Sequence, residues 1–459
     1  MTETVAVSWA AVELGGANWG DTRLNRRLVR VAERLGAQPG ASIPTACGGW
    51  AETQAAYRLL AHEAVTWEQV LAPHGDCSIE RLRAQPVVLC VQDSTELDFT
   101  AQPGITGLGP LSYLRQHGLY VHPTLAVTPD GVPLGVLDAW WWTRDRETFG
   151  EDKRHWPSEA QESMRWLEGF ERCAELAATL PDTRLVYVAD RASDIHEFLV
   201  RAQRYPQVDW LIRAAQDRKL ADGDTLGDRL AQAPVLGEVC FILPARPTRP
   251  GRSVVLTVRA ERVTLQPQGG EPVTVTTLRA REERAPAGVE PLDWRLLTNR
   301  PAETLAAAAE LMQWYGCRWT IEVFFRIFKT GCRVEALQLS TLERLEPALA
   351  LYLIIAWRMQ YLTVLGRITP ELPCNAALDQ AEWQAVYVAS PRQPPPATPP
   401  ATPPPLPAMR GWIARLAGHL GRKCDGPPGP QALWIGLQRA RDLAWGMQLA
   451  SELHVQSVS

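Results

Sequence analysis

Apolar residues recur at helical spacing through the first seventy residues of the chain. Asp21, a residue type that caps helices, precedes a segment that predicts a helix from Thr22 to Leu35. One face of this helix carries apolar residues three or four positions apart: Leu24, Leu28, Val31 and Leu35. Arginines form a second stripe at similar spacing: Arg23, Arg27, Arg30 and Arg34. A basic stripe is typical of a solvated face, but a helix that contacts DNA phosphates presents one as well.

From Pro86 onward the pattern changes to short apolar runs. Three of these runs predict strands, over residues 87–91, 119–127 and 132–142, and a tight turn at 128–131 joins the last two into a hairpin. A helix beginning near Ser158 follows, and then a fourth apolar strand over 185–189. Three meandering strands, a helix and a returning strand form the start of a ribonuclease-H-like mixed α/β sheet. That topology places the ends of the first and fourth strands side by side.

The second half of the chain departs from this rhythm. Short β-prone stretches at 254–265 and 273–278 indicate an inserted β subdomain, after which residues 294–297 resume the main sheet. A long helix is expected from about Ala302 to Lys329, followed by a helical tail. The tail is interrupted by residues 391–407, which are rich in Pro, Ala and Thr and therefore predict a stiff extended linker.

These changes of pattern divide the chain, whose 459 residues are too many for one compact core. We expect a helical domain over 1–70 and an α/β domain over 71–370 with its β insertion at about 222–290. A helical C-terminal domain over 371–459 would contain the Pro-rich linker.

Composition changes this picture little. The net charge of −4 argues mildly against a protein that coats nucleic acid, although charges can be segregated by face. The nine cysteines show no CxxC pair and no zinc spacing, so we expect reduced thiols in a cytoplasmic protein, and the N-terminus has no signal-peptide pattern. The most apolar run, from Pro347 to Trp357, is too short to span a bilayer and predicts a buried helix.

Two aspartates follow predicted buried strands, Asp93 after the first and Asp190 after the fourth. Carboxylates at strand ends point into the crevice where α/β sheets bind ligands. Two that lie close together repel unless a divalent cation neutralises them, and oxygen-only ligands favour Mg²⁺ or Mn²⁺. The alternative is that both merely start turns or cap helices. Asp98 and Asp194 are rivals by residue type, but they lie beyond the strand ends.

The long helix expected after residue 302 has one polar stripe and one apolar face. The stripe falls within an arc of roughly 60° and consists of Tyr315, Arg318, Glu322 and Lys329. The apolar face consists of Ile321, Phe324 and Phe328. A salt-bridged solvent face would give this periodicity. The other interpretation is that Glu322 completes a metal site while Arg318 and Lys329 hold phosphates.

The spacing Tyr315-x2-Arg318-x3-Glu322-x6-Lys329 resembles the Tyr-Arg-Glu-Lys signature of the insertion-sequence-four family, which are transposases of the DDE type. The resemblance continues along nearly the whole chain in order. Gly20 to Val29 is similar to the family's end-binding helix, and Gln92-Asp93-Ser94-Thr95 to its first catalytic segment. Val188-Ala189-Asp190-Arg191 is similar to the second catalytic segment.

This resemblance implies a cut-and-paste DNA transposase that nicks element ends, forms and opens a hairpin, and transfers strands. Asp93, Asp190 and Glu322 would be the catalytic acids and would bind Mg²⁺ or Mn²⁺, two ions per active site. The three domains would bind DNA ends, catalyse the reaction and form the dimer. The partners would be double-stranded DNA, from transposon ends and target, and a second copy in a synaptic complex. The setting would be the cytoplasm of a bacterium, at the nucleoid.

The resemblance also implies a set of DNA-binding residues: Arg27, Arg213, Trp294, Tyr315, Arg318 and Lys329. Trp294 resembles the residue that stacks on a flipped base, and the alternative for it is a plain core tryptophan. Two other functional classes remain open at this point. One is a catalytically inactive DNA-binding inhibitor of transposition, and the other is a metal-dependent nuclease that does not join strands.

Overall fold

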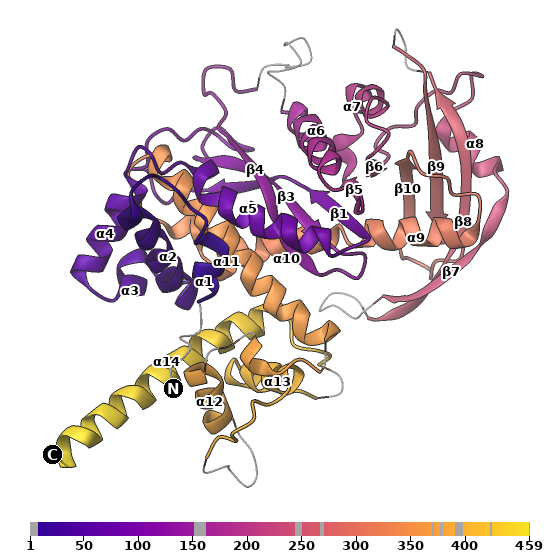
Figure 1. Ribbon diagram of the computed structural model, residues 1–459. Helices are drawn as coiled ribbons and strands as arrows, with labels where there is room; N and C mark the ends of the chain where they lie inside the picture. Colours follow the sequence, from indigo (N-terminus) through magenta and orange to yellow (C-terminus); the bar gives the residue numbers. More distant parts are fainter. Residues whose placement is uncertain are drawn as a thin grey trace.

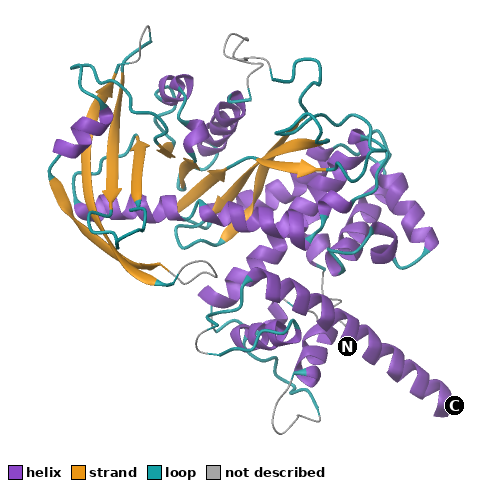
Figure 2. Ribbon diagram, turned by 180° about the vertical axis from the view of Figure 1, so that it is seen from behind, coloured by secondary structure: helices purple, strands orange, loops and turns teal. Residues whose placement is uncertain are grey.

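The computed structural model describes residues 8–458 except for 151–161, 244–249, 267–269, 370, 377, 379, 391–397 and 423–424. One large mixed sheet runs through the molecule, with helices on both of its faces (Figure 1). A helical N-terminal region lies beside one end of the sheet, and a separate group of C-terminal helices lies below it (Figures 1 and 2). The expected α/β core with helical regions at both ends is confirmed.

The sheet has ten strands in the order β2-β3-β1-β5-β6-β10-β9-β8-β7, with β4 paired to β3. The pairs β1–β5 and β5–β6 are parallel, and the other pairs are antiparallel. The predicted strands of the core have these bounds: β1 Val87–Gln92, β3 Gly118–Val127, β4 Pro133–Trp142, β5 Arg184–Ala189 and β10 Asp293–Thr298. Two further strands of the sheet, β2 Thr95–Asp98 and β6 Asp209–Arg213, were not predicted.

The β-rich insertion does not form a layer of its own but extends the main sheet. Its strands are β7 Val235–Leu243, β8 Arg252–Leu265 and β9 Val273–Arg281. β9 pairs with β10 along the whole length of β10, so the insertion continues the main sheet. Alternation of apolar and polar residues indicates that a strand is half-buried, but it does not indicate which strand edge it joins.

Two apolar cores lie on opposite faces of the sheet, and β1 contributes to both. Leu89 and Val91 belong to the core on one face, and Val88 and Cys90 belong to the core on the other. The first core is covered by α9 Leu305–Gly316, α10 Trp319–Arg326 and α11 Leu342–Ile368, and the second by α6 Met164–Ala178 and α7 His196–Ala202. Burial on both faces explains why β1 is continuously apolar rather than alternating. The expected start of α6 near Ser158 lies outside the described residues.

Helix α11 contains the most apolar run of the chain. Its 27 residues are long and apolar enough to cross a membrane, but 72% of its most apolar window is buried inside the protein. It packs against α5 Trp67–Arg83 and β4. The prediction of a buried helix around Pro347 to Trp357 is therefore confirmed.

The predicted helix from Ala302 to Lys329 is wrong as a single element. The chain forms α9, then α10, and then a π-helical turn over Ile327–Gly331. Arg318 stands at the junction between α9 and α10. The apolar face is as predicted, because Ile321, Phe324 and Phe328 are all fully buried.

The N-terminal region consists of α1 Trp9–Leu14, α2 Thr22–Ala37, α3 Ile43–Cys47 and α4 Trp50–Leu60. The Asp21 side chain caps α2 by accepting a hydrogen bond from the Arg23 amide, as predicted. Leu28, Val31 and Leu35 are buried. On the basic stripe, Arg27 and Arg30 each lie 3.1 Å from Glu52 on α4.

The C-terminal region contains α12 Gln380–Ala389, α13 Leu406–Leu416 and α14 Pro430–Val458. The expected linker extended to residue 407, but α13 already begins at Leu406. The Leu406 amide donates to the Leu372 carbonyl at 2.7 Å, which ties the end of the linker to the segment before α12. Residues 391–397 of the linker lie outside the described part of the chain.

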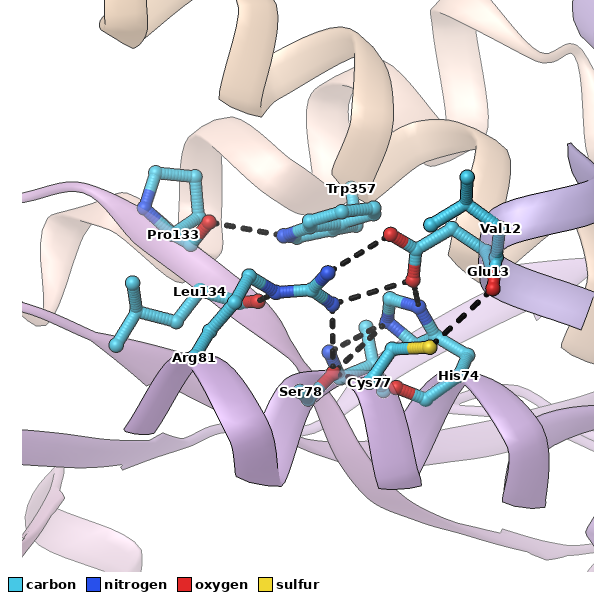
Figure 3. A network of polar contacts seen from close by, with 10 residues as sticks. Val12, Glu13, His74, Cys77, Ser78, Arg81, Pro133, Leu134 and Trp357 are labelled. Carbon is cyan, nitrogen blue, oxygen red and sulfur yellow. Dashed lines mark hydrogen bonds and ion pairs between the residues drawn. The ribbon is translucent and has the colours of Figure 1, made fainter. Parts of the chain in front are cut away.

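A buried polar network joins the N-terminal region to the α/β core (Figure 3). Arg81 on α5 donates to both carboxylate oxygens of Glu13 on α1, at 2.8 and 3.2 Å, and its guanidinium lies over the Trp357 ring. The Glu13 carboxylate also contacts Nδ1 of the buried His74 at 2.7 Å. Burial by itself raises the pKa of Glu13, but the contacts with His74 and Arg81 lower it overall. The carboxylate therefore depends on these two partners.

We predict that Arg81→Met lowers the free energy of unfolding by about 3 kcal/mol, because it leaves a buried carboxylate short of its cationic partner. Urea denaturation followed by tryptophan fluorescence measures this loss. Arg83→Met on the same helix is the control. It breaks an exposed pair with Glu80 and should cost less than about 1 kcal/mol. Equal losses for the two variants would show that the network does not stabilise the joint between the two regions.

Candidate active site

Asp93 and Asp190 follow two adjacent parallel strands at the same level. The register of β1 and β5 pairs Val91 with Val188, and each aspartate comes two residues later. The carboxyl ends of neighbouring parallel strands meet at one edge, so the two carboxylates lie close together. The side chain of Asp190 also caps the following turn, by accepting from the Ala192 amide at 2.8 Å.

Arg318 connects the first of these acids to Glu322. Its guanidinium donates to Oδ2 of Asp93 at 2.8 Å and to Oε1 of Glu322 at 2.6 Å. Arg318 is only 8% exposed, which rules out a solvated, salt-bridged face at this residue. Because α9 ends and α10 begins at Arg318, the helix junction aims this side chain at the end of β1. The sequence predicted a stripe containing Arg318 and Glu322, but not the link to Asp93.

Asp93 is buried close to two other carboxylates, and this environment changes its pKa. Burial and the negative charge of Asp190 raise the pKa of Asp93 to about 6, against the lowering effect of Arg318. Glu322 adds to the repulsion. One guanidinium therefore does not fully neutralise the three acids.

The three carboxylates suit a divalent cation in their ligand atoms and in their negative charge. All three offer hard oxygen ligands of the type that Mg²⁺ and Mn²⁺ prefer, and the repulsion at Asp93 is relieved by an added positive charge. Among the described residues, however, no three His, Cys, Asp or Glu side chains are already gathered at metal-binding distance. Arg318 lies between Asp93 and Glu322 instead.

The remaining residues of the polar stripe border the same edge of the sheet. Tyr315 is buried, and its ring meets that of Trp294 edge-on with 5.8 Å between centroids. Burial raises the pKa of the Tyr315 phenol, while the nearby charges of Arg318 and Arg213 lower it. Lys329 lies within 3.4 Å of the Thr95 hydroxyl, two residues beyond Asp93. The structure thus brings Arg213, Trp294, Tyr315, Arg318 and Lys329 around the acids.

Arg27 lies outside this cluster, on α2 of the N-terminal region, where it contacts Glu52. The structure agrees only in part with the alternative interpretation of Trp294 as a plain core tryptophan. Its ring packs against one apolar core, but it is half-buried rather than enclosed.

The two rival aspartates have structural partners. Asp194 is buried and accepts from Arg218 and from the amides of Ala215 and Gln216. Asp98 accepts from the Thr100 amide and from Gln116. Asp194 is therefore engaged in a buried ion pair with Arg218, and Asp98 is the last residue of β2, beyond the carboxyl end of β1.

Sequence reasoning missed Glu335 at the border of this site. Its carboxylate accepts from the Asp98 amide at 3.0 Å and lies 3.7 Å from the Lys329 ammonium. Glu335 thereby holds Lys329 beside the strand that follows Asp93. It lies in a short 3-10 turn, so no helical or strand periodicity marks it.

Comparison with known protein families identifies the class of this protein. Three family models match the chain: Transposase DNA-binding over residues 6–65, Transposase DDE domain over 168–358, and Transposase Tn5 dimerisation domain over 354–453. The chain therefore belongs to the DDE transposases of the Tn5 type, and it is a DNA transposase with DNA-binding and dimerisation domains. Asp190 and Glu322 lie inside the matched DDE segment, whereas Asp93 precedes it and joins it through the pairing of β1 with β5.

We predict that Asp93→Asn stabilises the metal-free protein at pH 8 by up to about 3 kcal/mol and changes it little at pH 4. The folded-state pKa of about 6 is raised above the ordinary value of 3.8. The stability that the bound proton provides is therefore complete below pH 4 and is lost as the pH rises through 6. Thermal unfolding in EDTA at both pH values measures the difference. Asp182→Asn, at an exposed position, is the control. Equal effects at pH 4 and pH 8 would contradict the crowding of Asp93.

Proposed function

We propose that this transposase works by a cut-and-paste mechanism in which Asp93, Asp190 and Glu322 are the catalytic, metal-binding acids. The observation that carries the proposal is the convergence of the three carboxylates and Arg318 at the carboxyl ends of β1 and β5. When bound, two Mg²⁺ or Mn²⁺ ions would activate a water or 3′-hydroxyl nucleophile and stabilise the leaving oxygen. We infer that the reaction needs no covalent bond between the protein and the DNA.

The cations of the chain have two roles in this proposal. In the DNA-free protein, Arg318 partly neutralises Asp93 and Glu322. Asp93 and Glu322 would hold a metal ion that supplies this neutralisation, and the planar guanidinium of Arg318 would then contact phosphate. Lys329, held by Glu335 beside Thr95, is proposed to contact a neighbouring phosphate of the same DNA strand. Arg213 contributes positive charge beside Tyr315.

Trp294 and Tyr315 are proposed to act when the DNA end is distorted. Closing a hairpin requires a sharply bent end with one base out of the stack, which costs a few kcal/mol. A half-buried indole braced edge-on by a buried phenol is a rigid platform for that base. This rigidity favours the stacking role of Trp294 over a packing role alone.

DNA recognition and assembly are assigned to the helical regions. Arg27 on α2 is proposed to contact the element end, with Glu52 holding its side chain in place before DNA binds. We propose that α13 and α14 form the homodimer of a synaptic complex, which then captures target DNA. α14 extends well away from the rest of the chain (Figure 2) and exposes apolar side chains that include Trp445, at 66% exposed. We place the protein in the bacterial cytoplasm, at the nucleoid.

The second candidate function is a catalytically inactive DNA-binding inhibitor of transposition. Such a protein has no need to keep its carboxylates crowded, because a buried, repelled carboxylate is destabilising. The convergence of the three carboxylates at the ends of β1 and β5 therefore favours an active enzyme. A metal-dependent nuclease without strand joining would share the acids, but it would have no need of a dimerisation domain.

Replacing Asp93, Asp190 or Glu322 by Ala should abolish Mg²⁺-dependent nicking of an element-end duplex and leave end binding nearly unchanged. The three acids are needed for the cleavage step, whereas affinity for the DNA end comes mostly from contacts between other residues and the phosphates. Gel analysis of cleavage and a parallel binding titration measure the two effects. Asp182→Ala is the control and should cleave normally.

Measurable nicking by Glu322→Ala would remove Glu322 from the proposed set of acids. Adding target DNA to the wild-type reaction separates the three functional classes. Joined products indicate a transposase, cleavage without joining indicates a nuclease, and binding alone indicates the inhibitor.

Trp294→Ala should separate the steps of the reaction. First-strand nicking acts on a nearly undistorted strand, but hairpin closure must hold the flipped base, and loss of a base–aromatic stack costs roughly 1–3 kcal/mol. Hairpin formation should therefore slow by about 5- to 150-fold while nicked intermediate accumulates on a gel. Trp294→Phe, which retains a ring, should recover part of the rate. A parallel fall in nicking and hairpin formation, together with a lower melting temperature, would instead identify Trp294 as a packing residue.

A further inference from the structure

Asp93 lies at a break in an otherwise continuous strand. β1 pairs with β3 as far as Gln92 opposite Thr124, and β2 resumes the pairing with Thr95 opposite Val121. Carried through the gap, this register places Asp93 opposite Pro123 and Ser94 opposite His122. The pairing with β3 is therefore interrupted at Asp93, opposite a proline, which has no N–H to donate.

The side chain of His122 bridges this break. Its Nδ1 lies 2.8 Å from the Ser94 hydroxyl, just after the break, and its Nε2 lies 3.2 Å from Oε1 of Gln92, just before it. The other atom of the Gln92 amide, Nε2, donates to the Thr124 hydroxyl at 2.6 Å. Both residues that flank Asp93 are therefore held by one imidazole ring.

These contacts determine the proton arrangement of the ring. Because the Gln92 NH₂ group donates to Thr124, its carbonyl oxygen has to accept from Nε2–H of His122. Nδ1 is then unprotonated and accepts from the Ser94 hydroxyl. Burial lowers the pKa of His122 to about 3, so the ring is neutral at the pH of the reaction.

The ring and its partners are enclosed from the side of α6. Trp166 meets the His122 ring edge-on with 4.6 Å between centroids, and His122 is fully buried. Gly169 lies one turn further along α6, where a Cβ would come within 1.8 Å of the Gln92 amide. A helix carrying any larger side chain at Gly169 could not approach so closely. The packing thus leaves the His122 network little freedom to rearrange.

We propose that His122 is a positioning residue for Asp93, which fixes Gln92 and Ser94 on either side of the strand break so that the carboxylate is held toward Asp190. This inference rests on the proposed function, because it assumes that Asp93 binds a metal ion. His122 does not touch the reacting atoms. It acts through Ser94, whose amide also donates to Oδ1 of Asp93 at 2.9 Å.

The test compares His122→Phe with His122→Asn in the full-length protein. Phenylalanine provides an aromatic ring but no hydrogen-bond acceptor for the Ser94 hydroxyl. The side-chain oxygen of asparagine lies nearly where Nδ1 of His122 lies and can accept that bond. Mn²⁺ binding without DNA, followed by the electron paramagnetic resonance of free Mn²⁺, should weaken about tenfold in His122→Phe and stay within about threefold of wild type in His122→Asn. His117→Phe is the control. It removes a histidine contact with the Ile105 carbonyl that does not reach Asp93.

Nicking rates give a second measurement. In His122→Phe, nicking in Mg²⁺ should fall more than nicking in Mn²⁺, because Mg²⁺ demands nearly ideal ligand geometry. Unchanged Mn²⁺ affinity in His122→Phe would overturn the positioning role. Equal weakening in both His122 variants, in step with lower melting temperatures, would overturn it as well. If wild-type protein has no Mn²⁺ site that Asp190→Ala removes, the proposed metal site itself fails, whatever His122 does.

Discussion

The mutual repulsion of Asp93 and Asp190 is the constraint on which the rest of this structure depends. Parallel pairing of β1 with β5 brings the two carboxylates to one edge of the sheet, and burial deepens the cost of their charges. Arg318 lies at the junction between α9 and α10, and its guanidinium donates hydrogen bonds to Asp93 and Glu322. This arrangement partly neutralises the three carboxylates in the folded protein.

The sheet gives this edge a rigid foundation. Both faces of β1 are buried, under α9, α10 and α11 on one side and under α6 and α7 on the other, so the strand has little room to move. The same helices carry side chains of the candidate site: Arg318 and Glu322 at the start of α10, and Trp166 over His122. The packing of the core and the geometry of the candidate site therefore depend on the same contacts.

Polar networks join regions of the chain that also share one apolar core. Glu13, His74 and Arg81 link α1 to α5 in the interior, where an unpaired charge is costly. Arg441 on α14 donates to the carbonyls of Gly36 and Ala37 at the end of α2, at 2.8 Å each. The two helical regions that the family assigns to DNA binding and dimerisation thus contact each other within one chain.

The sequence alone determined the strands that end at Asp93 and Asp190 and the apolar face of the helices around Glu322, because burial periodicity is a local property. It also identified Asp93, Asp190 and Glu322 as candidate acids, through strand ends and the spacing from Tyr315 to Lys329. Only the tertiary structure decided that the β insertion extends the main sheet, that the helix from Ala302 to Lys329 is broken, and that Arg318 reaches Asp93. It also decided that Asp194 is occupied by Arg218 and that His122 bridges the strand break. These features depend on contacts between residues far apart in the chain, which no local pattern of hydrophobicity encodes.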